Sequence, residues 1–172
     1  PKQKVSGYGI VSLPKNAANG QISAILKGRS LKNELNYNCE TWAEWTKDTG
    51  TVGDATGLEI TKVDATWKGA RITANVKANT KYGVLLNVVS STLTKGVFIA
   101  GGITGAAAWA ISNANMGSGS TPPTVGNFKW VDTTKADLSA GKLFVIYLYR
   151  EEPVGNKIKL KDFRLFELPT GS

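Results

Sequence analysis

The chain has 172 residues, a formal net charge of +8 and no histidine, which excludes Ser-His and Cys-His catalysis and imidazole zinc sites. Cys39 is the single cysteine, so an intrachain disulfide is excluded and a buried, inert thiol is expected. Apolar residues make up 41% of the chain and no apolar run reaches the ~18 residues typical of a membrane helix, so we expect one domain with a sizeable core and no membrane partner.

The first 30 residues differ from the rest of the chain in their sequence pattern. Gly9 to Pro14 (GIVSLP) and Gln21 to Lys27 (QISAILK) are short apolar stretches between polar residues. They predict a small hairpin or arm over residues 1–30, which leads into a main domain over residues 31–172.

Strand signals recur through the main domain, while helical signals are weak. Thr41 to Lys47 predicts at most a short helix or turn, and Asn113 to Val125 (NANMGSGSTPPTV) predicts a long, mobile polar loop. Seven short strands without intervening helices predict an all-β fold, an antiparallel β-sandwich. The seven segments are Gly57 to Val63, Gly69 to Val76, Lys81 to Ser90, Gly96 to Ala100, Asn127 to Val131, Lys142 to Arg150 and Ile158 to Leu168.

Five tryptophans are many for this length, and a tryptophan usually packs in a core. Trp67 is an exception, because it lies at a turn between two predicted strands, where its ring can stand over a cleft. In the strand that follows Lys142, alternation places Tyr147 and Tyr149 on the face opposite the apolar residues. Flat aromatic rings stack on sugar rings, so we predict a ligand site at Trp67, Tyr147, Tyr149 and Trp109.

The last predicted strand, KIKLKDFRLFEL, contains a break in its alternation. Asp162 falls where an apolar residue is due, and the apolar residues after it follow the opposite parity. This pattern predicts an inward carboxylate that needs a cation or a set of amide donors. The basic residues of this strand are interpreted as a solvated face or as a sheet edge protected by charge. They are Lys157, Lys159, Lys161 and Arg164.

Catalytic patterns are missing from the sequence. Glu151 and Glu152 are adjacent at a strand end, so their side chains diverge and we expect both to be solvated. No carboxylate pair is placed for glycoside hydrolysis, and Gly101 to Gly105 lacks the ending of a phosphate loop. The basic residues do not interleave with aromatic residues in one patch, so nucleic acid is not an expected partner. We therefore expect a protein that is not an enzyme.

Four segments resemble, in order, the jelly-roll carbohydrate-binding modules of families 4, 9 and 22. They are Asn33 to Trp45 (NELNYNCETWAEW), Leu58 to Gly69 (LEITKVDATWKG), Thr80-Lys81-Tyr82, and Ile158 to Leu165 (IKLKDFRL). The chain departs from the family pattern in two places. Lys161 stands where the first of two aspartates is usual, and Asp64 lies near where many members carry an arginine.

The resemblance implies a jelly roll over residues 31–168 and a structural calcium ion that ties the opening and closing strands together. Glu40 and Asp162 match the family's ligands, and backbone carbonyls would complete the shell. The alternative from the residues alone is that Asp162 accepts hydrogen bonds from backbone amides or pairs with a lysine.

The stretch from Leu13-Pro14 through Gly28-Arg29-Ser30-Leu31 to Glu40 resembles a leader found in tail, baseplate and other minor structural proteins of phages and prophages of Gram-positive bacteria. This resemblance implies a place on the virion surface, with other virion proteins as partners. The expected function is therefore a non-catalytic glycan-binding or adhesion domain for cell-surface or cell-wall polysaccharide. The net charge of +8 suits an anionic wall polymer.

Two alternatives stay open. The domain could be purely structural, as a capsid decoration or tail spacer in the virion. It could also be a binding module of a secreted bacterial enzyme that degrades polysaccharide.

Overall fold

The computed structural model describes residues 2–5, 9–12, 34–35, 42–74, 76–101, 109–111, 121–136, 138 and 143–169, with the backbone alone described in 2–5, 9–12 and 109–111. The chain divides into two compact units, Pro1–Lys32 and Asn33–Ser172. In the first unit, β1 (Lys2–Val5) and β2 (Gly9–Ser12) form an antiparallel hairpin. The segment predicted from Gly9 to Pro14 contains β2, whereas Gln21 to Lys27, Cys39 and Glu40 lie outside the described residues.

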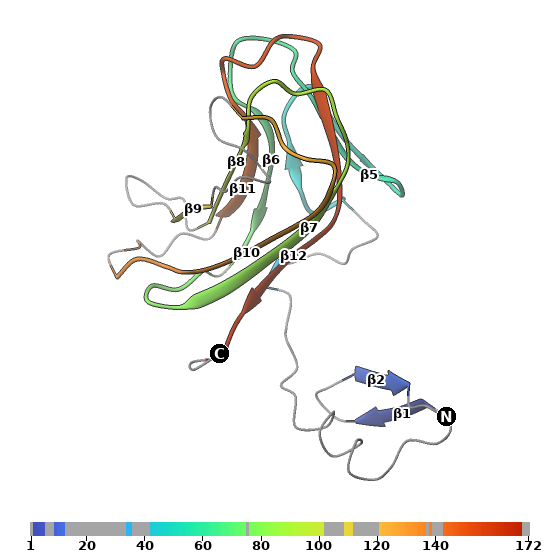
Figure 1. The fold of residues 1–172 in the computed structure, drawn as a ribbon, viewed down its shortest axis with the longest axis vertical. Coiled ribbons are helices and arrows are strands. Elements are labelled where there is room, and N and C mark those ends of the chain that lie inside the picture. The colour runs from blue at the N-terminus through green and yellow to red at the C-terminus, as the bar shows by residue number, and fades with distance from the viewer. Residues whose placement is uncertain are drawn as a thin grey trace. The chain divides into compact units, whose positions relative to one another are not determined.

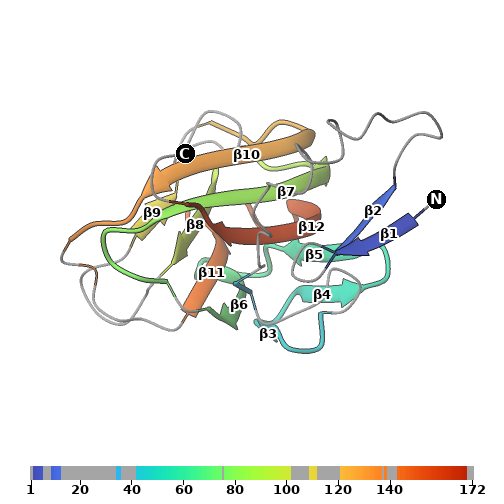
Figure 2. The same ribbon diagram turned by 90° about the horizontal axis from the view of Figure 1, so that it is seen from below.

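The described part of the second unit forms two antiparallel sheets of five strands each (Figure 1). The first sheet, here called sheet one, has the order β10-β7-β12-β5-β4, which can be followed across Figure 2. Its strands are β4 (Thr51–Asp54), β5 (Gly57–Thr61), β7 (Lys81–Ser91), β10 (Gly126–Thr133) and β12 (Lys157–Glu167). Sheet two has the order β3-β6-β11-β8-β9, formed by β3 (Thr46–Lys47), β6 (Lys68–Thr73), β8 (Val97–Gly101), β9 (Trp109–Ile111) and β11 (Leu143–Leu148).

Successive strands cross between the sheets, since β5, β7, β10 and β12 belong to sheet one and β6, β8 and β11 to sheet two. The prediction of an all-β, antiparallel jelly-roll sandwich is therefore confirmed. All seven predicted segments correspond to strands, while the short strands β3, β4 and β9 were not predicted. Thr41 to Lys47 contains a turn followed by β3, and no helix among the described residues could cross a membrane.

The core lies between the sheets and follows from strand alternation. Phe144, Ile146 and Leu148 of β11 are fully buried, while Tyr147 between them points to the opposite face. Aromatic residues from the turn before β3 close one part of the core, because the ring of Trp45 lies 5.6 Å from that of Phe163. The other core residues are mainly aliphatic, and they include Leu58, Ile60, Ala70, Ile72, Val84, Leu86, Val88, Val97, Ile99, Ile158, Leu160 and Leu165.

The break in alternation along β12 is a β-bulge, and the prediction of an inward Asp162 is wrong. The register with β7 shifts between Lys161 and Arg164, so one extra residue fits into β12 there. Asp162 has a φ of 55° and its side chain is exposed. Aspartate tolerates this left-handed conformation better than most residues. The bulge lets Leu160 before it and Phe163 after it both face the core.

A buried carboxylate does exist, but it is Glu152 in the connection between β11 and β12. Glu152 is 3% exposed, so the prediction that it is solvated is wrong. Its carboxylate accepts hydrogen bonds from the backbone amides of Thr94 (2.9 Å) and Lys95 (2.7 Å) and from the side-chain amide of Asn156 (2.7 Å). The set of amide donors that the sequence pattern led us to expect at Asp162 is therefore found at Glu152.

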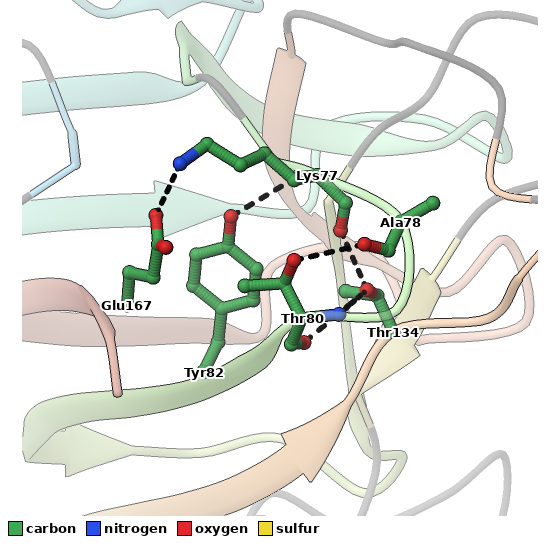
Figure 3. A network of polar contacts seen from close by, with 6 residues as sticks. All are labelled: Lys77, Ala78, Thr80, Tyr82, Thr134 and Glu167. Carbon is green, nitrogen blue, oxygen red and sulfur yellow. Dashed lines mark hydrogen bonds and ion pairs between the residues drawn. The ribbon is translucent and has the colours of Figure 1, made fainter. Parts of the chain in front are cut away.

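The Thr-x-Tyr start of β7 holds the connection between β6 and β7 in place (Figure 3). The hydroxyl of Tyr82, a fully buried residue, accepts a hydrogen bond from the amide of Lys77 at 3.0 Å. The hydroxyl of Thr134 accepts from the amide of Thr80 at 2.9 Å and donates to the carbonyl of Lys77. Lys77 also pairs with Glu167 at 2.7 Å. These contacts join the ends of three strands of sheet one.

Candidate functional site

The outer face of sheet two carries a row of aromatic residues across its central strands. Tyr147 of β11 is paired with Gly69 of β6 on one side and with Phe98 of β8 on the other. Paired residues in neighbouring strands share a face, and the alternate residues of these strands fill the core. Tyr147 and Phe98 therefore project away from the core, and both are half-buried.

Trp67, which directly precedes β6, completes an aromatic cluster on this face. Its ring centroid lies 5.2 Å from Tyr149, 5.6 Å from Phe98 and 6.3 Å from Tyr147. All four residues are half-buried, so part of each remains accessible. The structure thus brings together three of the predicted ligand residues, Trp67, Tyr147 and Tyr149. Phe98 was not predicted as a ligand residue. It lies in a predicted strand, at a position that alternates with the core residues and therefore faces outward.

Gly69 makes room for this cluster. A Cβ atom at residue 69 would lie 2.7 Å from Cδ1 of Tyr147 and 1.9 Å from the carbonyl oxygen of Ile146. Both distances are shorter than van der Waals contact, so any larger residue would displace the tyrosine ring or the strand. Gly69, two residues after Trp67, therefore has a specific packing role next to the Tyr147 ring.

A hollow of about 340 Å³ lies beside the cluster, lined by Asp48, Trp67, Phe98 and Tyr147. This volume lies at the lower end of the range found for small-ligand pockets, about 300–1,000 Å³. Three aromatic rings and one carboxylate provide apolar surface together with a hydrogen-bond acceptor. Asp48 was not predicted, because it lies in a turn before β4 and only the tertiary fold brings it to β6.

An ion pair between Asp48 and Arg71 lies at the polar side of the hollow. Arg71 of β6 contacts Asp48 Oδ1 at 3.1 Å, and both side chains are partly exposed. The pKa of Arg71 is raised, first by a hydrogen bond with Tyr147 and further by Asp48. Asp48 is itself fixed to β6, because its backbone amide donates to the carbonyl of Gly69 at 3.0 Å. The hollow therefore has a fixed carboxylate acceptor beside the rings, and Arg71 pairs with that carboxylate.

A short turn positions Trp67. The amide and the hydroxyl of Thr66 both donate to Asp64 Oδ1, at 2.9 and 2.5 Å. Lys68 pairs with the second oxygen of Asp64 at 2.8 Å. These contacts lower the pKa of Asp64 well below its usual value, with the hydrogen bond from Lys68 as the largest cause and those from Thr66 next. Trp67 thus lies between two residues that the same carboxylate holds.

Lys62 is fully buried beneath this turn and joins it to β11. Its ammonium group donates to the carbonyl of Thr66 at 2.5 Å and to the carbonyl of Tyr149 at 2.6 Å. Burial lowers the pKa of Lys62, while Asp64 opposes that shift. One buried cation therefore connects the two chain segments that carry Trp67 and Tyr149. The sequence alone does not distinguish this lysine from the exposed ones.

The other predicted site residues lie elsewhere or outside the described side chains. Trp109 lies in β9, where its backbone pairs with Gly101 of β8, and its side chain is not described. Glu40 is outside the described residues, and the exposed Asp162 has no cluster of further metal-ligating side chains around it among the described residues. The described residues alone therefore do not form a carboxylate shell for calcium, and the calcium site stays a prediction.

No protein-family model and no curated protein sequence matches the chain. Among solved structures, it is similar to Family 16 Carbohydrate Binding Module-2, with 15% identity and a TM-score of 0.46 over 76% of this chain and 100% of that one. It is also similar to TmCBM61 in complex with β-1,4-galactotriose, with 12% identity and a TM-score of 0.47 over 80% and 99% of the two chains. An arabinose-bound GH51 α-L-arabinofuranosidase matches at 12% identity and a TM-score of 0.47 over 78% of this chain and 25% of its own.

Proposed function

We propose that the second unit is a glycan-binding domain whose ligand occupies the hollow beside Trp67. The observation that carries this proposal is the cluster of four half-buried aromatic residues next to an Asp48–Arg71 pair. Sugar rings present apolar C–H faces and polar hydroxyl rims. Aromatic rings suit the faces, and a carboxylate with a guanidinium suits the hydroxyls.

We further propose that the domain is not catalytic. Glycoside hydrolysis ordinarily needs two carboxyl groups on either side of the scissile bond. Among the described residues that line the hollow, Asp48 is the only carboxylate, and it is paired with Arg71. This arrangement supports binding rather than hydrolysis.

The biological setting forms the second part of the proposal. We propose that the domain lies on the surface of a phage or prophage virion and attaches to a cell-wall polysaccharide of a Gram-positive host. The resemblance of the leader between Leu13 and Glu40 supports this setting, as does the net charge of +8. A structural calcium held by Glu40 and Asp162 belongs to the same proposal.

A glycan array and a pull-down with purified Gram-positive cell walls test the function. We expect the wild-type domain to bind at least one polysaccharide and Trp67→Ala to bind it about 10- to 100-fold more weakly, as for the loss of one aromatic stacking platform. Trp130→Ala is the matched control, because Trp130 is a half-buried tryptophan of sheet one that packs against the core. It should lower the melting temperature and leave glycan affinity unchanged.

A folded wild-type domain that binds no glycan and no cell wall would contradict the proposal. A large loss of stability in Trp67→Ala without any glycan affinity to lose would favour a purely structural virion domain. Genomic sequence around the chain would separate a virion protein from a module of a polysaccharide-degrading enzyme.

A further inference from the structure

We propose that Arg150 binds an anionic group of the saccharide, so that the ligand class is an acidic glycan bearing carboxylate or phosphate. This inference rests on the proposed glycan-binding function of the hollow. The guanidinium carbon of Arg150 lies 5.9 Å from the centre of the Trp67 ring, and the residue is exposed. A cation is therefore held against the aromatic ring that lines the hollow.

Within the described part of the chain, Lys68 and Arg71 are paired with carboxylates, whereas Arg150 is not. Lys68 pairs with Asp64 at 2.8 Å and Arg71 pairs with Asp48 at 3.1 Å. Arg150 forms no ion pair with a carboxylate of the described residues, and the adjacent Glu151 is exposed. The positive charge at Arg150 thus remains available to a ligand.

The backbone around Arg150 is fixed by two buried charges. The carbonyl of Tyr149, immediately before it, accepts a hydrogen bond from the buried Lys62 at 2.6 Å. Glu152, two residues after it, is anchored by the amides of Thr94 and Lys95. A cation on such a fixed segment loses less conformational freedom when it binds a ligand than one on a loose loop. This segment therefore suits a binding role better than a solubilising one.

The chemistry of the side chain narrows the ligand class. A guanidinium presents paired N–H donors that match the two oxygens of a carboxylate or a phosphate. A neutral sugar offers hydroxyl groups, which gain little from a full positive charge. An acidic saccharide can place its ring against the aromatic cluster and its anionic group against Arg150.

Matched glycan pairs test the inference. The probes are a uronic-acid polysaccharide with its carboxyl-reduced form, and a phosphate-bearing wall glycan with its dephosphorylated form. We expect the wild type to prefer the acidic member of at least one pair, and the pair concerned identifies carboxylate or phosphate as the anion. Arg150→Gln should weaken binding of that member about tenfold, or about 1.4 kcal/mol, with less than a twofold change for the neutral member. Arg150→Lys should fall between, because it keeps the charge and loses the paired donors.

Arg164→Gln is the matched control, since Arg164 is a half-buried arginine of sheet one on β12. It changes the net charge equally and should leave both affinities unchanged. Equal losses for Arg150→Gln and Arg164→Gln, or a wild type that prefers the neutral member, would overturn the role of Arg150. If the wild type prefers the neutral member, Trp67→Ala should still weaken binding about 10- to 100-fold, so the glycan function is tested separately from its charge preference. A wild type that binds no member of either pair would overturn the acidic ligand class. The glycan-binding function is overturned only if the array and the cell-wall pull-down are negative as well.

Discussion

The outer faces of the two sheets differ, although a turn with the same three residues leads into a strand of each. Asp54-Ala55-Thr56 leads into β5 of sheet one, and Asp64-Ala65-Thr66 leads to Trp67 and β6 of sheet two. In both turns the amide and hydroxyl of the threonine donate to Oδ1 of the aspartate. The first turn is followed by Gly57, whose φ is 136°, and the second by Trp67.

Sheet one presents polar and charged side chains to solvent. Asn87 donates to Asn127 at 2.7 Å and Lys157 pairs with Glu59 at 3.4 Å. The basic residues of β12 lie on a central strand between β7 and β5, so they are not protecting a sheet edge. Of the two interpretations of this basic face, the edge is therefore wrong and the solvated face agrees with the structure.

The Asp-Ala-Thr sequence is therefore enough to form the turn. It is not enough to form the aromatic site, which is found only at the second turn. The second turn differs from the first in its surroundings, because Lys62 and Lys68 hold it and Tyr149 packs beside its tryptophan. These partners come from distant parts of the chain.

Glu152→Ala should have the largest effect, because it leaves the backbone amides of Thr94 and Lys95 and the side-chain amide of Asn156 without their carboxylate acceptor. We expect the free energy of unfolding to fall by about 3 kcal/mol. Urea unfolding followed by fluorescence measures it. The neighbouring Glu151→Ala should change stability by less than about 0.5 kcal/mol, because Glu151 is exposed. Equal effects of the two changes would contradict a structural role for the buried carboxylate.

Asp162→Val should destabilise sheet one by about 1–2 kcal/mol, because a β-branched residue is poorly tolerated at a φ of 55°. Asp162→Asn, which tolerates this conformation, should stay within about 0.5 kcal/mol of the wild type in chelator. Thermal melting with and without calcium measures both. If Asp162→Asn melts at a lower temperature than the wild type in calcium, but at the same temperature in chelator, the result would support the predicted calcium site.

Lys62→Met should lower both stability and ligand affinity. The carbonyls of Thr66 and Tyr149 lose the ammonium donor, so we expect the free energy of unfolding to fall by about 1–2 kcal/mol. The segments that carry Trp67 and Tyr149 would lose their shared donor, so we expect glycan affinity to fall about tenfold. In a Trp67→Ala background, Lys62→Met should cause no further loss of affinity. A full additional loss in the double variant would show that Lys62 does not act through Trp67.

Asp64→Ala should lower glycan affinity a few-fold, whereas the matched Asp54→Ala should not change it. The pKa of each aspartate is lowered, for Asp64 mainly by Lys68 and for Asp54 mainly by Thr56. A carboxyl group with a lowered pKa contributes stability above its usual pKa, near 3.8, and loses it as the pH falls through the lower folded value. NMR titration should therefore find both carboxyls charged at pH 3.8, with Asp64 titrating at the lower pH. A normal titration of Asp64 would contradict the role of its turn.

The strands of the sandwich could be predicted because alternation and turn residues are local signals. Seven segments were recognised in this way, while the two-residue strand β3 and the glycine-containing β4 carry too little pattern. The bulge at Asp162 was read as a buried charge, because a parity break has the same sequence signature as an inward polar residue. Only the pairing of β12 with β7 distinguishes the two.

The aromatic residues of the site could be predicted in part, and its polar residues could not. Tyr147 and Tyr149 follow from the parity of one strand, and Trp67 from its position at a turn. Asp48 and Lys62 reach the site through contacts between segments distant in sequence. Their burial and their partners depend on the tertiary fold, which leaves no mark in the local pattern.

Mapping the bound glycan by ¹H–¹⁵N NMR, with the saccharide that binds best on the array, tests the proposed binding surface most directly. We expect shift changes at the indole N–H of Trp67 and at the amides of Phe98 and Tyr147, on the outer face of sheet two. The amides of Asn87 and Lys159, on the outer face of sheet one, should stay unchanged. Shift changes concentrated at Asn87 and Lys159, with none at Trp67, would contradict the proposed binding surface.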